Sequence, residues 1–165
     1  MIMSPFESLP NNSRVWVYQA NRPLSDAEVQ AIQNSIADFV GEWSSHSRNV
    51  IAAGDVLHNL FIVLMADESA FSVSGCSIDS SVNFIRSVEN EFGIELFDRF
   101  TTAYLDGNQI KMAGKEEFQQ LIDNGMINEK TIVFNNVIQT KKEFGQGWKV
   151  PLTQSWHTRL FKLPA

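Results

Sequence analysis

The sequence predicts an α+β fold, in which strands and helices are mixed along one chain of 165 residues. Short runs of β-branched and aromatic residues alternate with longer segments whose apolar residues recur every three or four positions. These patterns are typical of strands and of amphipathic helices, respectively. Hydrophobic residues make up 44% of the chain and include 12 Phe and 4 Trp, so a core can form without disulfides or metals.

The first half of the chain, residues 1–96, is predicted to begin with a strand and a helix. Residues 14–18 are rich in β-branched and aromatic side chains, which indicates a strand. Ser25-Asp26-Ala27-Glu28 is a capping box, in which the serine and glutamate side chains satisfy free backbone N–H groups. Apolar residues continue at helical spacing as far as Trp43, so a helix is expected over this stretch.

Two strands and a second helix are predicted next. Residues 49–56 and 60–66 form a pair joined near His58, and the second strand is apolar on both faces, which places it at the centre of a sheet. A helix over residues 79–92 is expected to stop at Gly93. With a final strand over residues 97–104, the order becomes β-α-β-β-α-β, that of a ferredoxin-like sandwich with two helices on one sheet face.

The second half, residues 97–165, is predicted to be a smaller α+β unit. Asp106-Gly107 indicates a hairpin turn between strands at residues 102–105 and 109–112. A short helix over residues 115–124, a strand over residues 131–134 and a capping box at Thr140–Glu143 follow. No flexible linker separates the halves, so we expect them to pack as one compact unit.

Composition and charge argue against several classes of function. Thirteen basic residues against 19 acidic ones give a net charge of −6, and the basic residues are scattered, so nucleic acid is not an expected partner. The longest apolar run, residues 60–66, is too short to cross a bilayer, and no secretory signal is visible. The single cysteine cannot form an intrachain disulfide. A cytoplasmic protein without a membrane partner is expected, and no oligomeric state is indicated.

That cysteine, Cys76, lies in a segment that joins an apolar strand to a helix. A thiol there would lie near unpaired backbone N–H groups and the positive end of the helix dipole, both of which favour the thiolate. A thiol-dependent enzyme would also need a base, for which His46 and His157 are candidates, with Asp79 or Asp98 to orient the imidazole. The catalytic set under this alternative is Cys76, His157, His46 and Asp79.

Two other interpretations of Cys76 are open. The first is a half-buried scaffold cysteine next to a helix cap supplied by Ser77 or Asp79. The second is a metal site with His46 and His157 as further ligands, but zinc ligands normally occur in pairs a few residues apart. Neither Cys-x-x-Cys nor His-x-x-x-His is present, so we expect no metal and no cofactor. His58 is expected to face solvent in its turn.

Five segments spread over nearly the whole chain resemble a family of small uncharacterised bacterial proteins that often carry the label "ABC transporter ATPase". They are residues 15–19, 74–79, 97–99, 131–136 and 155–157. A P-loop requires Gly-x-x-x-x-Gly-Lys-Ser/Thr so that backbone N–H groups and the lysine surround the phosphates. Here Gly114-Lys115 is followed by Glu116, and Gly107 lies at the wrong distance upstream. The ATPase label is therefore not supported by the motifs.

The second half resembles a GYF-like interaction module, through the aromatic hairpin at Tyr104, the short helix, the strand at residues 131–134 and the later Trp148. The resemblance implies binding of proline-rich or other extended peptides on aromatic side chains. The Gly-Pro dipeptide expected after the second strand is replaced by Lys111-Met112-Ala113-Gly114, and extra residues precede Trp148. The candidate ligand-binding residues are Trp148, Trp156, Tyr104 and Arg99.

The sequence thus favours a binding or interaction protein that recognises a peptide, a protein or a small ligand. The alternative is a thiol-dependent enzyme that uses Cys76 with a histidine base.

Overall fold

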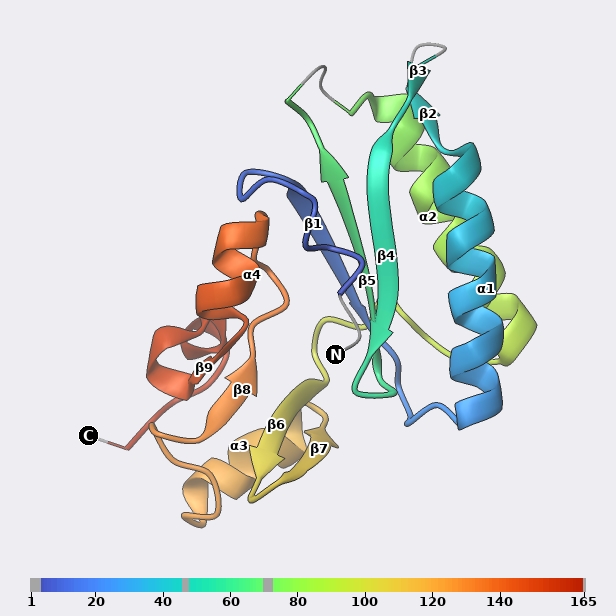
Figure 1. Ribbon diagram of the computed structural model, residues 1–165. Helices are drawn as coiled ribbons and strands as arrows, with labels where there is room; N and C mark the ends of the chain where they lie inside the picture. Colours follow the sequence, from blue (N-terminus) through green and yellow to red (C-terminus); the bar gives the residue numbers. More distant parts are fainter. Residues whose placement is uncertain (1–3, 46–47, 70–72, 165) are drawn as a thin grey trace. The chain divides into compact units, whose positions relative to one another are not determined.

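The computed structural model describes residues 4–45, 48–69 and 73–164. The fold is α+β, as predicted, with four α-helices and two larger antiparallel sheets in these residues. The chain divides into two compact units (Figure 1): unit 1 is Met1–Phe97 with Gln139–Lys142, and unit 2 is Asp98–Ile138 with Glu143–Ala165. None of the helices in the described ranges combines the length and the apolar character needed to cross a membrane.

Unit 1 contains a three-stranded antiparallel sheet in the order β1-β5-β4. The strands are β1 (Arg14–Gln19), β4 (Ile51–Leu57) and β5 (Phe61–Asp67). The central position of β5 is confirmed, because residues 61–66 are buried on both faces of the strand. Helices α1 (Asp26–Glu42) and α2 (Gly75–Phe92) lie side by side on the same face of this sheet (Figure 1). A short hairpin, β2 (Ser44–Ser45) and β3 (Arg48–Asn49), precedes β4.

The two helices of unit 1 begin and end at identifiable caps. Ser25 caps α1, and the predicted capping box with Glu28 is present. Helix α2 begins four residues earlier than predicted, since Ser74 and not Ser77 or Asp79 is its N-cap. It ends at Gly93, whose φ of 62° gives the expected left-handed stop. Phe39 of α1 stacks on Phe84 of α2 with the ring centroids 4.5 Å apart, which fastens the helices together.

The predicted strand over residues 97–104 is wrong in position. Asp98 accepts hydrogen bonds from Phe100 N and Thr101 Oγ1, so the chain turns there, and a strand begins only at Thr102. That strand belongs to the sheet of unit 2. In unit 1 the outer edge of β1 is met instead by residues 139–142, through Val15 N to Gln139 O at 3.0 Å and an isolated bridge between Arg14 and Thr140.

Unit 2 contains a four-stranded antiparallel sheet in the order β7-β6-β8-β9. Its strands and helices are β6 (Thr102–Asp106), β7 (Gln109–Ala113), α3 (Lys115–Asp123), β8 (Ile132–Phe134), α4 (Lys141–Gly147), which begins in the last residues of unit 1, and β9 (Lys149–Pro151). The predicted Asp106-Gly107 hairpin turn is confirmed, with Gly107 at a φ of 63°. Two 3-10 turns, at Leu152–Gln154 and Trp156–Arg159, complete the unit.

The core of unit 2 forms between α3, the sheet and the C-terminal turns. Phe118 of α3 is its centre: its ring lies edge-on to Tyr104 at 5.7 Å and against Phe161 at 4.6 Å. The other buried members of this cluster are Ala113, Ile122, Ile127, Val133 and Leu152. The amphipathic spacing of α3 therefore supplies the packing that holds the four short strands together.

Candidate functional site

Cys76 is the second residue of α2 and its side chain is exposed. Ser74 Oγ accepts a hydrogen bond from Ser77 N at 3.2 Å, so the first helical turn is capped by the hydroxyl of a residue two positions before the cysteine. Asp79, one turn further on, is exposed as well. The strand-to-helix setting inferred from the sequence is thus present, but Cys76 lies inside the first turn of the helix and not three residues before its start, as predicted.

No base accompanies the thiol in the described part of the chain, where the Cys76 side chain has no polar contact. His46 lies outside the described residues. His58 is exposed in the turn between β4 and β5, as predicted, at the opposite end of the sheet from the start of α2 (Figure 1). Within the same described ranges, no group of three or more His, Cys, Asp or Glu residues could hold a metal ion.

His157 is a core residue of unit 2. Its side chain is buried, and burial lowers its pKa to about 4, so the imidazole is neutral near pH 7. Its Nδ1 lies 2.6 Å from Ser155 Oγ, and the ring stacks beside Trp156 and Phe161. Ser155 also caps the second 3-10 turn, so the Ser155–His157 pair organises the C-terminal segment.

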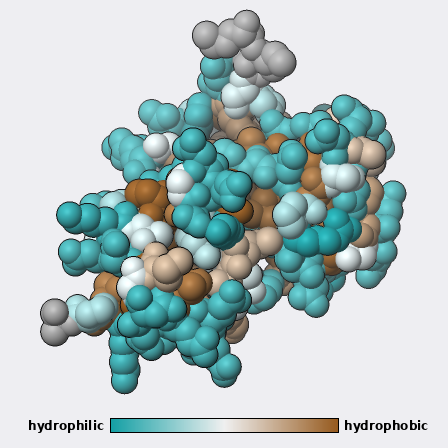
Figure 2. Space-filling model, turned by 90° about the horizontal axis from the view of Figure 1, so that it is seen from below, coloured by the Kyte–Doolittle hydropathy of each residue, from teal (hydrophilic) through white to brown (hydrophobic). Residues whose placement is uncertain are grey.

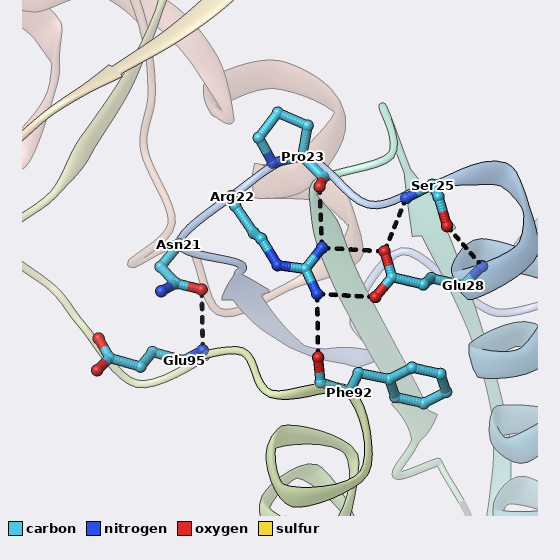
Figure 3. A network of polar contacts seen from close by, with 7 residues as sticks. All are labelled: Asn21, Arg22, Pro23, Ser25, Glu28, Phe92 and Glu95. Atoms are coloured by element: carbon cyan, nitrogen blue, oxygen red, sulfur yellow. Dashed lines mark hydrogen bonds and ion pairs between the residues drawn. The ribbon is translucent and has the colours of Figure 1, made fainter.

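A network of side-chain polar contacts in unit 1 is centred on Arg22 (Figure 3). Its guanidinium donates to both oxygens of Glu28 and to the carbonyl oxygen of Phe92 at the end of α2. Glu28 in turn accepts from Ser25 N, and Asn21 Oδ1 accepts from Glu95 N. These bonds hold the start of α1 against the end of α2. The charged groups of Arg22 and Glu28 therefore serve as structural contacts.

The predicted aromatic ligand-binding residues differ in exposure. Tyr104 and Trp148 are buried, at 9% and 4% exposed, whereas Trp156 is half-buried. Arg99 is exposed, in the irregular segment that precedes β6. The structure therefore does not gather these four residues on one open surface of unit 2, because Tyr104 is used in the core around Phe118.

Trp148 nevertheless belongs to an aromatic cluster that reaches the surface. Its ring lies 5.0 Å from Phe134 and 4.6 Å from Phe144, the latter nearly parallel at 21°. The indole Nε1 donates to Asn136 Oδ1 at 2.9 Å, which fixes the ring orientation. Phe144 is half-buried, and the next residue after Asn136, Val137, is 47% exposed.

We use the name aromatic surface of unit 2 for Phe144 and Trp148 together with Lys149, which follows Trp148, and the exposed Val137, which follows Asn136 in the sequence. The Lys149 amine lies 5.6 Å from the centre of the Trp148 ring and adds a positive charge to an otherwise apolar set. Sequence reasoning selected Trp148 but missed Val137 and Phe144. Their positions depend on how α4 meets the strands, and no spacing in the sequence reveals that.

Exposed apolar side chains are few and dispersed. Besides Val137, the larger ones in the described ranges are Ile51, Phe97, Phe100 and Met126. Figure 2 shows one face of the molecule, on which hydrophilic residues predominate and hydrophobic ones form small patches between them. Small patches suit recognition of a short segment better than a broad apolar interface.

Comparison with known proteins assigns no family to this chain: no protein-family model matches it, and no curated protein or solved structure matches at a significant level. The class that the structure defines is a two-unit α+β protein. The family resemblances inferred from the sequence stay predictions.

Proposed function

We propose that the protein is a binding module that recognises an extended, proline-containing segment of a partner protein on the aromatic surface of unit 2. The observation that carries the proposal is the row of three rings in which buried Phe134 lies edge-on to buried Trp148, and Trp148 stacks on the half-buried Phe144. Stacked rings offer a flat apolar surface for pyrrolidine rings, and a polyproline segment loses little chain entropy when it binds.

Two features support this site over the other apolar side chains of unit 2. The Trp148 indole is already held by Asn136, so the ring is preorganised and binding does not have to immobilise it. Lys149 places a cationic amine beside the rings, which favours a peptide that carries an acidic residue next to its prolines. The GYF-like resemblance of the second half implies the same class of ligand.

The thiol-dependent alternative has one observation in its favour, the exposure of Cys76 in the first turn of α2. A nucleophilic thiol needs a base within hydrogen-bonding reach, and the described residues place none beside it. Binding is therefore the function better supported by the geometry.

The test is a titration of the full-length, isotope-labelled protein with a defined proline-rich peptide, with and without a glutamate beside the prolines, followed by NMR. The Trp148 Nε1–H signal should shift, whereas the Trp43 Nε1–H signal, whose donor is bound to Ser77 O in unit 1, should not. The glutamate-containing peptide should bind more tightly.

Val137→Ser should weaken this binding severalfold, because it removes an exposed apolar contact without disturbing the core. Met126→Ser is the matched control, since Met126 is also a large exposed apolar residue, at 73%, and lies outside the aromatic surface. A peptide that binds both variants equally well, or that leaves the Trp148 signal unmoved, would contradict the proposal.

A further inference from the structure

The turn that ends α3 contains the one Asn-Gly dipeptide of the chain, Asn124-Gly125. Asn124 is the C-cap of the helix, and Gly125 follows it with a left-handed φ of 82°. Both residues are exposed. Asparagine is a chemically labile residue, and a following glycine increases this lability because no side chain hinders the glycine nitrogen. The turn therefore places a reactive amide beside an unhindered backbone nucleophile at the surface.

The reaction open to this pair is deamidation. The Gly125 nitrogen attacks Cγ of Asn124, so that an N–Cγ bond forms and the Cγ–Nδ2 bond breaks. The proton of the Gly125 N–H leaves with the side-chain nitrogen as ammonia, and a succinimide ring remains. Water then adds to either carbonyl group of the ring and gives aspartate or the β-linked isoaspartate. The only co-reactant is water, which reaches an exposed turn.

Two hydrogen bonds oppose this reaction while the turn is closed. Gly125 N donates to Ile122 O at 3.1 Å, and Asn124 Oδ1 accepts from Met126 N at 3.1 Å. Both bonds lie at the exposed end of a helix of nine residues, and helix ends open more readily than helix centres. A Cβ atom at Gly125 would meet nothing within 4 Å, so no neighbouring group obstructs the opening. The reaction therefore proceeds from the opened turn.

The same turn positions a core residue of unit 2. Ile127 N donates to Leu121 O at 3.0 Å, and the Ile127 side chain is 2% exposed in the cluster around Phe118. Isoaspartate inserts an additional carbon into the backbone between residues 124 and 125. The lengthened turn cannot keep both the bond to Leu121 and the position of Ile127 in the core.

We propose that Asn124 is a site of spontaneous deamidation, and that the modification destabilises unit 2. Either product adds a negative charge at the end of α3, directly after Asp123, where the helix dipole is already negative. Isoaspartate adds the displacement of Ile127 to this unfavourable charge. The modification therefore acts on the core through a residue that is itself at the surface.

The test is to age the full-length protein in mildly alkaline buffer and to map its peptides by mass spectrometry. Asn124 should lose its amide severalfold faster than Asn34, which is also exposed and also precedes a small residue but lies in the middle of α1. An isoaspartate-specific methyltransferase should label the peptide that contains residue 124. Aged protein that keeps the amide at Asn124, or in which Asn34 reacts as fast, would overturn the proposal.

The effect on stability is measured with Asn124→Gln as the matched variant. Glutamine keeps an amide but would have to close a larger ring, which forms much more slowly. Wild-type protein should unfold at a lower urea concentration after ageing than before, whereas Asn124→Gln should unfold at the same concentration before and after. Deamidated wild-type protein that unfolds at the same urea concentration as the fresh protein would show that the modification does not destabilise unit 2.

Discussion

The guanidinium of Arg22 and the carboxylate of Glu28 form a two-pronged ion pair, with N–O distances of 2.9 and 2.8 Å, at the place where α1 begins and α2 ends. Arg22 also donates to Phe92 O at 3.0 Å, and so uses an unsatisfied carbonyl group at the end of α2. The Arg22 side chain thereby contacts both the first turn of α1 and the last carbonyl groups of α2, which are distant in the sequence. Several consequences for stability can be measured.

Replacing Glu28 with Gln should lower the melting temperature, because the variant keeps the shape of the side chain but loses the charge that Arg22 binds. Glu91→Gln, at an exposed position near the end of α2, is the matched control and should have little effect. Thermal unfolding followed by circular dichroism is the measurement. Equal melting temperatures for the two variants would show that the ion pair does not stabilise the fold.

The Arg22–Glu28 pair should also make the stability of the protein depend on pH in the acidic range. Hydrogen bonds from Arg22 and then from Ser25 lower the pKa of Glu28 from 4.5 to about 2. A carboxylate whose pKa is lowered by folding stabilises the folded state at every pH above its pKa in the unfolded chain. This contribution is lost as the pH falls from 4.5 to 2. Melting temperatures of the wild type should fall across that window more steeply than those of Glu28→Gln.

His157 should control stability at a higher pH. Burial lowers its pKa from 6.5 to about 4, so the unfolded chain binds a proton more readily than the folded one. The contribution of the neutral imidazole is complete above pH 6.5 and is lost as the pH falls towards 4, by roughly 3 kcal/mol. The free energy of unfolding, measured by urea unfolding at several pH values, should depend less steeply on pH between 6.5 and 4 in His157→Gln than in the wild type. His58→Gln, at an exposed turn residue, should retain the wild-type slope.

Gly54 should not tolerate a side chain. A Cβ atom at this position would lie 2.5 Å from Ile36 Cγ2 and 2.8 Å from Leu64 Cδ2, so α1 could no longer pack as closely over β4. Gly54→Ala should reduce the free energy of unfolding by about 1–3 kcal/mol. The contrasting variant is Gly41→Ala in α1, where nothing lies within 4 Å and where alanine should stabilise the helix by about 0.5–1 kcal/mol. Both should be compared at one protein concentration by urea unfolding.

Cys76 should react with a thiol reagent in the folded protein, because its side chain is exposed. Asp79→Asn and His46→Gln should leave the rate of labelling unchanged if the cysteine belongs to the scaffold. A large fall in the rate with either variant would instead favour the thiol-dependent alternative, since it would identify a partner that activates the sulfur.

Local signals in the sequence were sufficient for most of the elements. The capping box at Ser25, the turn at Gly107 and the stop at Gly93 each depend on residues that are close in the sequence, and each is present in the structure. The start of α2 was missed because the local signals there are weak. Gly75 is a poor helix former and the first turn has no acidic residue, so little marks Ser74 as a cap.

Non-local pairing was not predictable in the same way. Residues 97–101 have the aromatic content of a strand, but Asp98 binds the backbone and the hydroxyl group of the residues just after it and turns the chain. The aromatic surface likewise depends on Asn136 meeting a tryptophan twelve positions later. Sequence reasoning singled out Trp148 without the two neighbours that make it a candidate site.

The return of residues 139–142 to the edge of β1 bears on how the chain is made. Val15 N donates to Gln139 O, so β1 can complete its backbone pairing only after residue 139, more than 120 residues further along the chain, has been translated. Final consolidation of unit 1 therefore follows the synthesis of residues 139–142. A nascent chain arrested before residue 139 would carry this strand with one side bare, and such chains should be especially prone to associate with one another or with chaperones.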